Sequence, residues 1–194
     1  LQFGGNIIKG PLSNATVFVD YDGDGILDSG EPSTTTDSNG AFTLTSTSAT
    51  AQIVATTDAN TIDTSTGQSL AGVILKAPAG SKVVSPSSTL MQEGNLTATQ
   101  VASVLGLDGV DILNFNPYAS GADAATALKV EKTAQQLMNT VKSIAAAGEG
   151  AGATASTSFA SALESVVDVI KTKVSSPGSV IDFTNTTDLN AIKT

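Results

Sequence analysis

Five carboxylates recur at regular intervals within twelve residues near the start of the chain. Counted from Asp20 as position 1, side-chain oxygens stand at positions 1, 3, 5, 9 and 12, a glycine at position 6 and a backbone carbonyl at position 7. This is the ligand spacing of an EF-hand-type calcium loop, and Ca²⁺ is a hard cation that takes six to eight oxygens. A solvated acidic loop is the alternative, but its carboxylates would repel one another. The sequence therefore predicts a calcium site at Asp20, Asp22, Asp24, Ile26, Asp28 and Glu31.

Four residue types that carry much of enzyme and metal chemistry are missing, because the chain has no Cys, His, Arg or Trp. Their absence excludes zinc fingers, thiol redox chemistry and Cys or His nucleophile–base pairs. It also removes the one side chain that ordinarily titrates near neutrality. No spacing of the remaining Ser, Lys and acidic residues singles out a nucleophile and its base. We expect a protein that is not an enzyme.

The negative charge is concentrated at one place. The formal net charge is −9, and residues 20–37 hold six acids and no lysine, so the rest of the chain is close to balance. Without a basic patch or arginine, we expect no nucleic-acid partner. No apolar run approaches eighteen residues, so we expect no membrane insertion.

The segment that holds the acidic stretch, residues 1–84, has a pattern that indicates β-structure. The 194-residue chain suits one large domain or two small ones. Before residue 85, short β-branched runs alternate with turn residues, which favours a small antiparallel β-sandwich over residues 1–84. Asp37 and Asn39 are expected to serve a hairpin turn ending at Gly40. The expected strands are 5–9, 15–20, 34–36, 41–46, 52–57 and 73–76.

The apolar spacing changes to a helical period after residue 85, so residues 85–194 are predicted to form a mainly helical half. Ser85 with Pro86 predicts one helix start, and Thr97 with Gln100 forms the capping-box pattern of another. The two longest helices are expected over 123–147 and 156–174, joined by a turn at 148–152, as an antiparallel αα-hairpin. The fold class is thus α+β, most simply one compact module with two halves.

Two groups of motifs resemble known families. Residues 10–44, with Ala-Thr-Val-Phe-Val-Asp leading into the acidic loop, resemble calcium-binding B-type sandwich modules of bacterial surface proteins. The segments at 63–67, 75–80, 84–90, 105–107 and 116–118 look like those of very large RTX adhesins of aquatic Gram-negative bacteria. The combination is similar to the calcium-dependent peptide-binding domain of those adhesins and covers most of residues 5–175.

The resemblance implies a secreted, extracellular module on the bacterial cell surface, connected to neighbouring domains of the same long chain. Its expected partner is a peptide or protein C-terminus on a host or neighbouring cell, held through the free carboxylate with the help of calcium. A calcium-rigidified spacer of a surface fibre is one alternative. Calcium-dependent carbohydrate binding is another, although two Tyr and no Trp leave few aromatic platforms for a sugar.

An anionic protein without arginine needs a cation, a lysine or backbone N–H groups to hold a carboxylate, so a second calcium site is a reasonable expectation. The first candidate is the polar segment 58–68, and an ordinary polar loop is its alternative. A weaker candidate is the pair Asp108 and Asp111, for which turn and capping roles are the alternative. Lys76 and Lys82 are expected at the surface. The candidate residues of the first segment are Asp58, Asn60, Asp63, Ser65, Thr66, Gly67 and Gln68.

Overall fold

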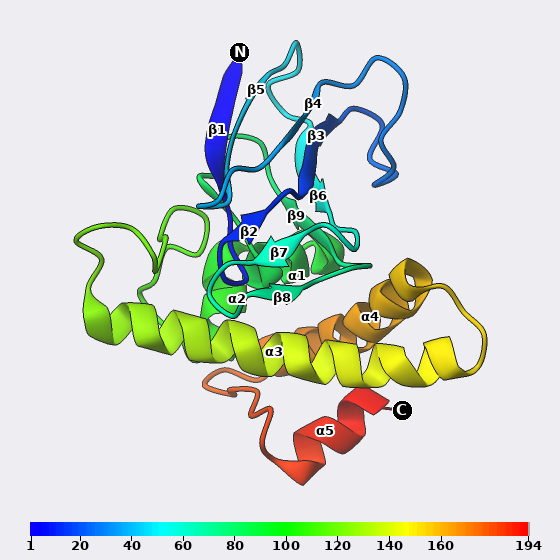
Figure 1. Ribbon diagram of the computed structural model, residues 1–194. Coiled ribbons are helices and arrows are strands. Elements are labelled where there is room, and N and C mark those ends of the chain that lie inside the picture. Colours follow the sequence, from blue (N-terminus) through cyan, green and yellow to red (C-terminus); the bar gives the residue numbers. More distant parts are fainter. Residues whose placement is uncertain (194) are drawn as a thin grey trace.

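The computed structural model describes residues 1–193 and has the α+β class that the sequence predicts (Figure 1). Within that range all strands precede residue 85 and all helices follow it. The strands are β1 (Gln2–Ile7), β2 (Leu12–Ser13), β3 (Thr16–Asp20), β4 (Ser33–Thr35), β5 (Ala41–Thr45), β6 (Gln52–Thr56), β7 (Ile62–Asp63), β8 (Gln68–Ser69), β9 (Ile74–Ala77) and β10 (Val83–Val84). The helices are α1 (Pro86–Gly94), α2 (Ala98–Val104), α3 (Ala124–Gly150), α4 (Ala155–Val174) and α5 (Thr186–Lys193).

The strands make three small sheets, in the orders β10-β1-β5, β2-β7-β8 and β4-β3-β6-β9. All pairings between named strands are antiparallel except one, because β10 runs parallel to β1. That pairing corrects the expectation of a wholly antiparallel arrangement. Strand β10 has two residues, which are too few to show the period-2 alternation of a strand in the sequence. For the same reason β2, β7 and β8 were not predicted.

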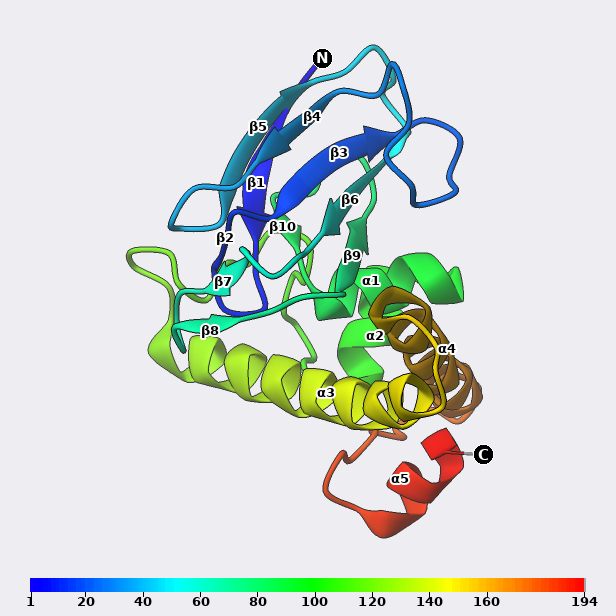
Figure 2. The same cartoon turned by 45° about the vertical axis from the view of Figure 1, so that its right-hand side comes forward.

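The largest sheet places the acidic loop. Strand β3 lies between β4 and β6, and its last residue, Asp20, stands directly opposite Gln52, the first residue of β6. The chain therefore leaves the sheet at Asp20 and returns at Ser33. The loop between β3 and β4 projects beyond the end of the sheet, on the side of α1 and α4 (Figure 2).

Side-chain caps begin the first two helices as predicted. Ser85 and Ser88 form a reciprocal capping box at α1, with Pro86 in its first turn, and Thr97 and Gln100 do the same at α2. The prediction for the end of α3 was wrong, because the helix continues through the expected turn as far as Gly150. The glycines at 148 and 150 continue the helix, and the chain turns only at Ala151–Thr154.

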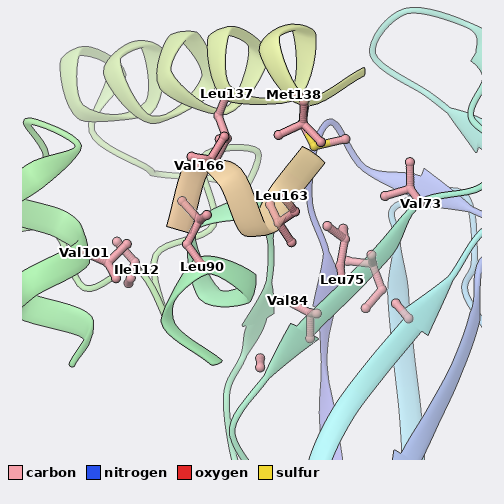
Figure 3. Close-up of a cluster of buried hydrophobic side chains, with 14 of the residues drawn as sticks. Val73, Leu75, Val84, Leu90, Val101, Ile112, Leu137, Met138, Leu163 and Val166 are labelled. Carbon is pink, nitrogen blue, oxygen red and sulfur yellow. The ribbon is translucent and has the colours of Figure 1, made fainter. Parts of the chain in front are cut away.

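One hydrophobic core joins the two halves (Figure 3). Val73, Leu75 and Val84 of the strand region share it with Leu90 of α1 and Leu163 of α4. Helix α4 contacts α1, α2, α3 and α5, so it is the element around which the helical half packs. Helix α5, which the sequence did not predict, is tied to α4 by an ion pair between Lys173 and Asp188 at 2.9 Å.

Candidate functional site

Three of the five acidic side chains of the loop converge. Ligand oxygens of Asp20, Asp22 and Asp24 lie within 4.8 Å of one another, and no other such group of three or more occurs in residues 1–193. Asp20 is 1 % exposed, whereas Asp22 and Asp24 are open to solvent. Asp28 and Glu31 stand outside this group. The donor set is all oxygen and anionic, which fits a hard divalent cation.

Backbone N–H groups fix the first carboxylate of the loop. Asp20 Oδ1 accepts from Gly23 N at 2.6 Å, and Oδ2 accepts from Gly25 N at 2.8 Å. Both glycines have φ near +80°, which side-chain-bearing residues rarely adopt. They allow the chain to curl around the carboxylate. Asp24 Oδ1 in turn accepts from Ile26 N at 2.7 Å, so the loop is ordered around its own acids.

Glu31 closes the loop. Its Oε1 accepts from Tyr21 N at 2.6 Å and its Oε2 accepts from Asp28 N at 3.0 Å. One carboxylate at position 12 therefore ties the first turn of the loop to the last. This explains why the spacing ends with the longer acidic side chain, which can span both N–H groups.

Opposing effects act on the acidity of the loop. Burial alone would raise the pKa of Asp20, but hydrogen bonds from Gln52, Gly23 and Gly25 outweigh it and lower the pKa. The pKa of Asp28 is raised, through partial desolvation and then through the negative charges of Asp24 and Asp22. A bound cation would relieve the like-charge repulsion that adds to the effect of desolvation on Asp28.

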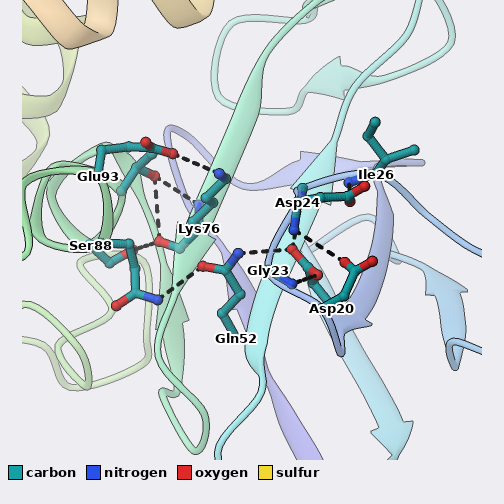
Figure 4. Close-up of polar contacts among 12 residues, drawn as sticks. Asp20, Gly23, Asp24, Ile26, Gln52, Lys76, Ser88 and Glu93 are labelled. Atoms are coloured by element: carbon teal, nitrogen blue, oxygen red, sulfur yellow. Dashed lines mark hydrogen bonds and ion pairs between the residues drawn. The ribbon is translucent and has the colours of Figure 1, made fainter.

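A chain of amides connects the loop to helix α1 (Figure 4). Gln52 Nε2 donates to Asp20 Oδ2 at 2.8 Å, and Gln52 Oε1 accepts from Gln92 Nε2 at 3.1 Å. The sequence prediction missed both glutamines. No local pattern marks them, because strand register brings Gln52 to Asp20 and the packing of α1 on β9 brings Gln92 to Gln52.

A cleft of about 530 Å³ opens beside the loop, between β9, α1 and α4. Lys76 lines it, and its Nζ pairs with Glu93 Oε1 at 2.7 Å (Figure 4). A Cβ at Gly25 would lie 3.3 Å from that ammonium. Lys76 is thus not the simple surface lysine expected, since its side chain is 17 % exposed. Helix α4 supplies the opposite wall. Residues lining the cleft include Asp24, Ile26, Ile74, Phe159, Leu163, Glu164, Asp168 and Lys171.

The predicted second site is organised around a buried ion pair. Asp63 Oδ2 contacts Lys9 Nζ at 2.6 Å, while Oδ1 accepts from the backbone and hydroxyl of Ser65. Burial opposes ionisation of Asp63, but the bonds from Lys9 and Ser65 prevail and lower its pKa. Thr66 and Gly67 donate backbone N–H groups to the Asp63 carbonyl.

Of the remaining candidates of the 58–68 segment, Asp58 and Asn60 lie in a turn, and Gln68 is the first residue of β8. Asp58 Oδ1 accepts from Asn60 N at 2.8 Å, and Gln68 N donates to Thr66 Oγ1 at 3.3 Å. Neither contact brings these side chains to the acidic loop. A role for this segment in holding an ion stays a prediction.

Asp111 also serves a turn, accepting from Leu113 N and Asn114 Nδ2. With Asp108 it lines a separate hollow of about 300 Å³ beside α2.

None of the helices within residues 1–193 has both the length and the apolar character needed to cross a membrane. Comparisons with protein-family models, with curated proteins and with solved structures give no significant match.

Proposed function

We propose that this chain is a calcium-dependent ligand-binding module of a bacterial surface adhesin, working outside the cell and recognising a peptide through its free C-terminal carboxylate. Calcium at the acidic loop is the cofactor. Oxygen sites of this kind fill where calcium is plentiful, which accords with an extracellular setting. Asp20, Asp22 and Asp24 would hold the ion, with Glu31 keeping the loop closed.

The observation that carries the proposal is that the acidic loop borders the cleft through one member of the acidic cluster, Asp24. Asp24 and Ile26 of the loop line that cleft together with Lys76. Lys76 is already paired with Glu93, so a cation bound at the loop would supply the unpaired positive charge beside it, where an anionic group of a ligand could be held. The apolar wall from α4 would contact the ligand's side chains. A spacer needs no such cleft, so its presence supports the binding role.

The finer description of the fold is part of the same proposal. We propose that the sheets of residues 1–84 act as a small β-sandwich and that α3 and α4 form an antiparallel αα-hairpin. The extensive contact of α3 with α4 across a four-residue connection supports the hairpin. In this arrangement the β-half carries the loop and the helical half carries the cleft wall.

Chelation tests the cofactor. At 100 times its dissociation constant, calcium stabilises the folded state by about 2.7 kcal/mol, which corresponds to about 5–10 °C in melting temperature. We expect EDTA to lower the melting temperature by this amount in calorimetry. Asp24→Ala should abolish the difference between calcium and EDTA. Glu149→Gln, at the exposed end of α3, is the matched loss of one charge and should keep it. Equal melting with and without calcium would remove the cofactor.

Peptide binding is tested by calorimetry with a panel of heptapeptides of varied sequence, each made with a free and an amidated C-terminus. We expect free-acid peptides to bind in calcium and to lose binding in EDTA, and amidated peptides not to bind. Equal binding of both forms would refute carboxylate recognition. Calcium-dependent melting without any peptide binding would instead support the spacer.

A further inference from the structure

A neutral side chain, Gln52, donates a hydrogen bond to the first carboxylate of the acidic loop. Gln52 stands opposite Asp20 in the register of β3 and β6, at the residue where the strand becomes the loop. Its amide is partly buried and uses both ends, donating to Asp20 and accepting from Gln92. Side chains that hydrogen-bond to a metal ligand orient that ligand in proteins.

The lone pairs of Asp20 show what this contact does. A carboxylate offers about four lone-pair sites. Gly25 and Gln52 both donate to Oδ2, and Gly23 alone donates to Oδ1. Oδ2 is therefore fully used, and Oδ1 keeps one site for a cation. Three donors also fix the rotation of the carboxylate.

The direction of the Gln52 amide is set from the helical half. An amide can present either its N–H₂ or its oxygen to a neighbour, and only the N–H₂ suits a carboxylate. Gln92 donates to Gln52 Oε1, so the N–H₂ of Gln52 is left to face Asp20. Buried hydroxyls hold α1 in place on β9: Ser88 Oγ donates to the Lys76 carbonyl at 2.7 Å, and Thr89 Oγ1 accepts from Lys76 N at 2.9 Å.

We infer that Gln52, oriented by Gln92, is the positioning residue of the acidic loop and holds Asp20 so that Oδ1 serves as its single metal-ligating oxygen. This inference rests on the proposed binding of calcium at the loop. It makes the affinity of a site in the β-half depend on a side chain of α1, 72 positions beyond Asp20 in the chain. It adds two neutral residues that no ligand-spacing rule would include.

The test is calcium titration by calorimetry of the full chain after removal of metal. We expect Gln52→Met to bind calcium about 10- to 100-fold more weakly, the usual effect of losing a side chain that hydrogen-bonds to a metal ligand. Gln92→Met should weaken binding less, because the Gln52 amide is then free but not reversed. Asp24→Ala locates the measured heat at the loop.

Gln92→Glu separates positioning from packing and from charge. Glutamate has the shape of glutamine but cannot donate when ionised, so it draws the N–H₂ of Gln52 toward itself and turns the Gln52 oxygen to Asp20. We expect it to bind calcium more weakly than Gln92→Met. A role in packing alone predicts the reverse order, since glutamate is the closer replacement. Added negative charge alone predicts tighter binding, and Gln135→Glu on α3 measures that effect far from the loop.

Melting of every variant in EDTA reports folding without metal and should stay close to that of the parent, because both glutamines are partly exposed. Parent-like calcium affinity of Gln52→Met, or tighter binding by Gln92→Glu than by Gln92→Met, would overturn the inference while leaving the calcium site in place. A parent protein that gives no calcium heat would refute both the site and its positioning residue.

Discussion

Lys9 and Asp63 form the most buried of the three ion pairs within residues 1–193, with side-chain exposures of 10 % and 2 %. Their close packing extends to the backbone, since a Cβ on Gly10 would collide with the Asp63 carboxylate. The pair joins the end of β1 to β7. The Asp63 carboxylate can either pair with Lys9 or bind a metal ion. Because lysine and serine already use some of its lone pairs, it has fewer to offer to a metal.

Removing Lys9 should be far more costly than removing the pair. Lys9→Met leaves the Asp63 charge buried and uncompensated, which typically costs about 3–5 kcal/mol of unfolding free energy. The double variant Lys9→Met with Asp63→Leu should recover most of this loss. Urea unfolding followed by circular dichroism measures both. Equal stability of the single and double variants would show that the ion pair is not coupled.

The lowered pKa of Asp63 predicts a dependence of stability on pH. A carboxyl whose folded-state pKa lies below the unfolded value of about 3.9 stabilises the fold above that pH and loses this contribution as the pH falls through the folded value. Asp63→Asn should therefore destabilise the protein more at pH 7 than at pH 3, which lies below the unfolded value. Urea unfolding at the two values gives the difference. A constant gap between parent and variant would contradict the lowered pKa.

At the scale of elements, the contact between α3 and α4 depends on a missing side chain. A Cβ at Gly148 would lie 2.9 Å from Ser158 Oγ and 3.3 Å from Ser158 Cβ. The glycine therefore permits close approach of two helices and does not end one. This is why the prediction of a turn at this position was wrong. Ser158 Oγ is buried and has no hydrogen-bond partner in the described structure. Its burial therefore lowers the stability of the fold, and replacing the serine would remove this cost.

Ser158→Ala should stabilise the protein by about 1 kcal/mol, because it removes a buried unsatisfied hydroxyl and favours the helix. Gly148→Ala gains about 1 kcal/mol of helix propensity but meets the serine, where overpacking costs about 1–3 kcal/mol. Gly148→Ala should therefore be more favourable by about 1 kcal/mol when Ser158 is already alanine. Thermal unfolding of the four proteins of this cycle measures the coupling. Additive effects would show that the helices adjust to the methyl group freely.

At the scale of the molecule, the core crosses the boundary between the halves. Leu75 and Val84 belong to strands and Val73 directly precedes β9, yet all three pack with helical residues such as Leu90 and Leu163 (Figure 3). The cleft has the same dual origin, since the loop and β9 form one side and α4 forms the other. The halves distinguished by composition are therefore one structural unit as far as the core and the cleft are concerned.

The shared core predicts cooperative unfolding. Residues 1–84 produced alone expose the strand face that α1 and α4 cover, and the apolar area left in water opposes folding. We expect the full chain to unfold in one transition and the fragment to give no cooperative thermal transition and poorly dispersed amide resonances. A fragment that melts cooperatively would mean that the β-half is an independent domain.

The features that the sequence alone determined are those that depend on neighbouring residues. The spacing of the acids around Gly25, and the capping boxes at Ser85 and Thr97, are local, because each hydrogen bond joins residues a few positions apart. The alternation of β-branched runs and the helical period likewise predicted the α+β fold class and the change from strands to helices near residue 85.

Tertiary structure alone decided what surrounds the loop. Gln52 meets Asp20 across 32 positions, and Gln92 meets Gln52 across 40. Such contacts arise from strand register and from the docking of α1 on β9, which no short window of sequence encodes. The same holds for the cleft wall on α4 and for the Lys9–Asp63 pair, 54 positions apart. The acidic loop can be predicted from sequence because its hydrogen bonds are local. Its positioning residue and the cleft cannot, because they depend on the packing of distant side chains around one core.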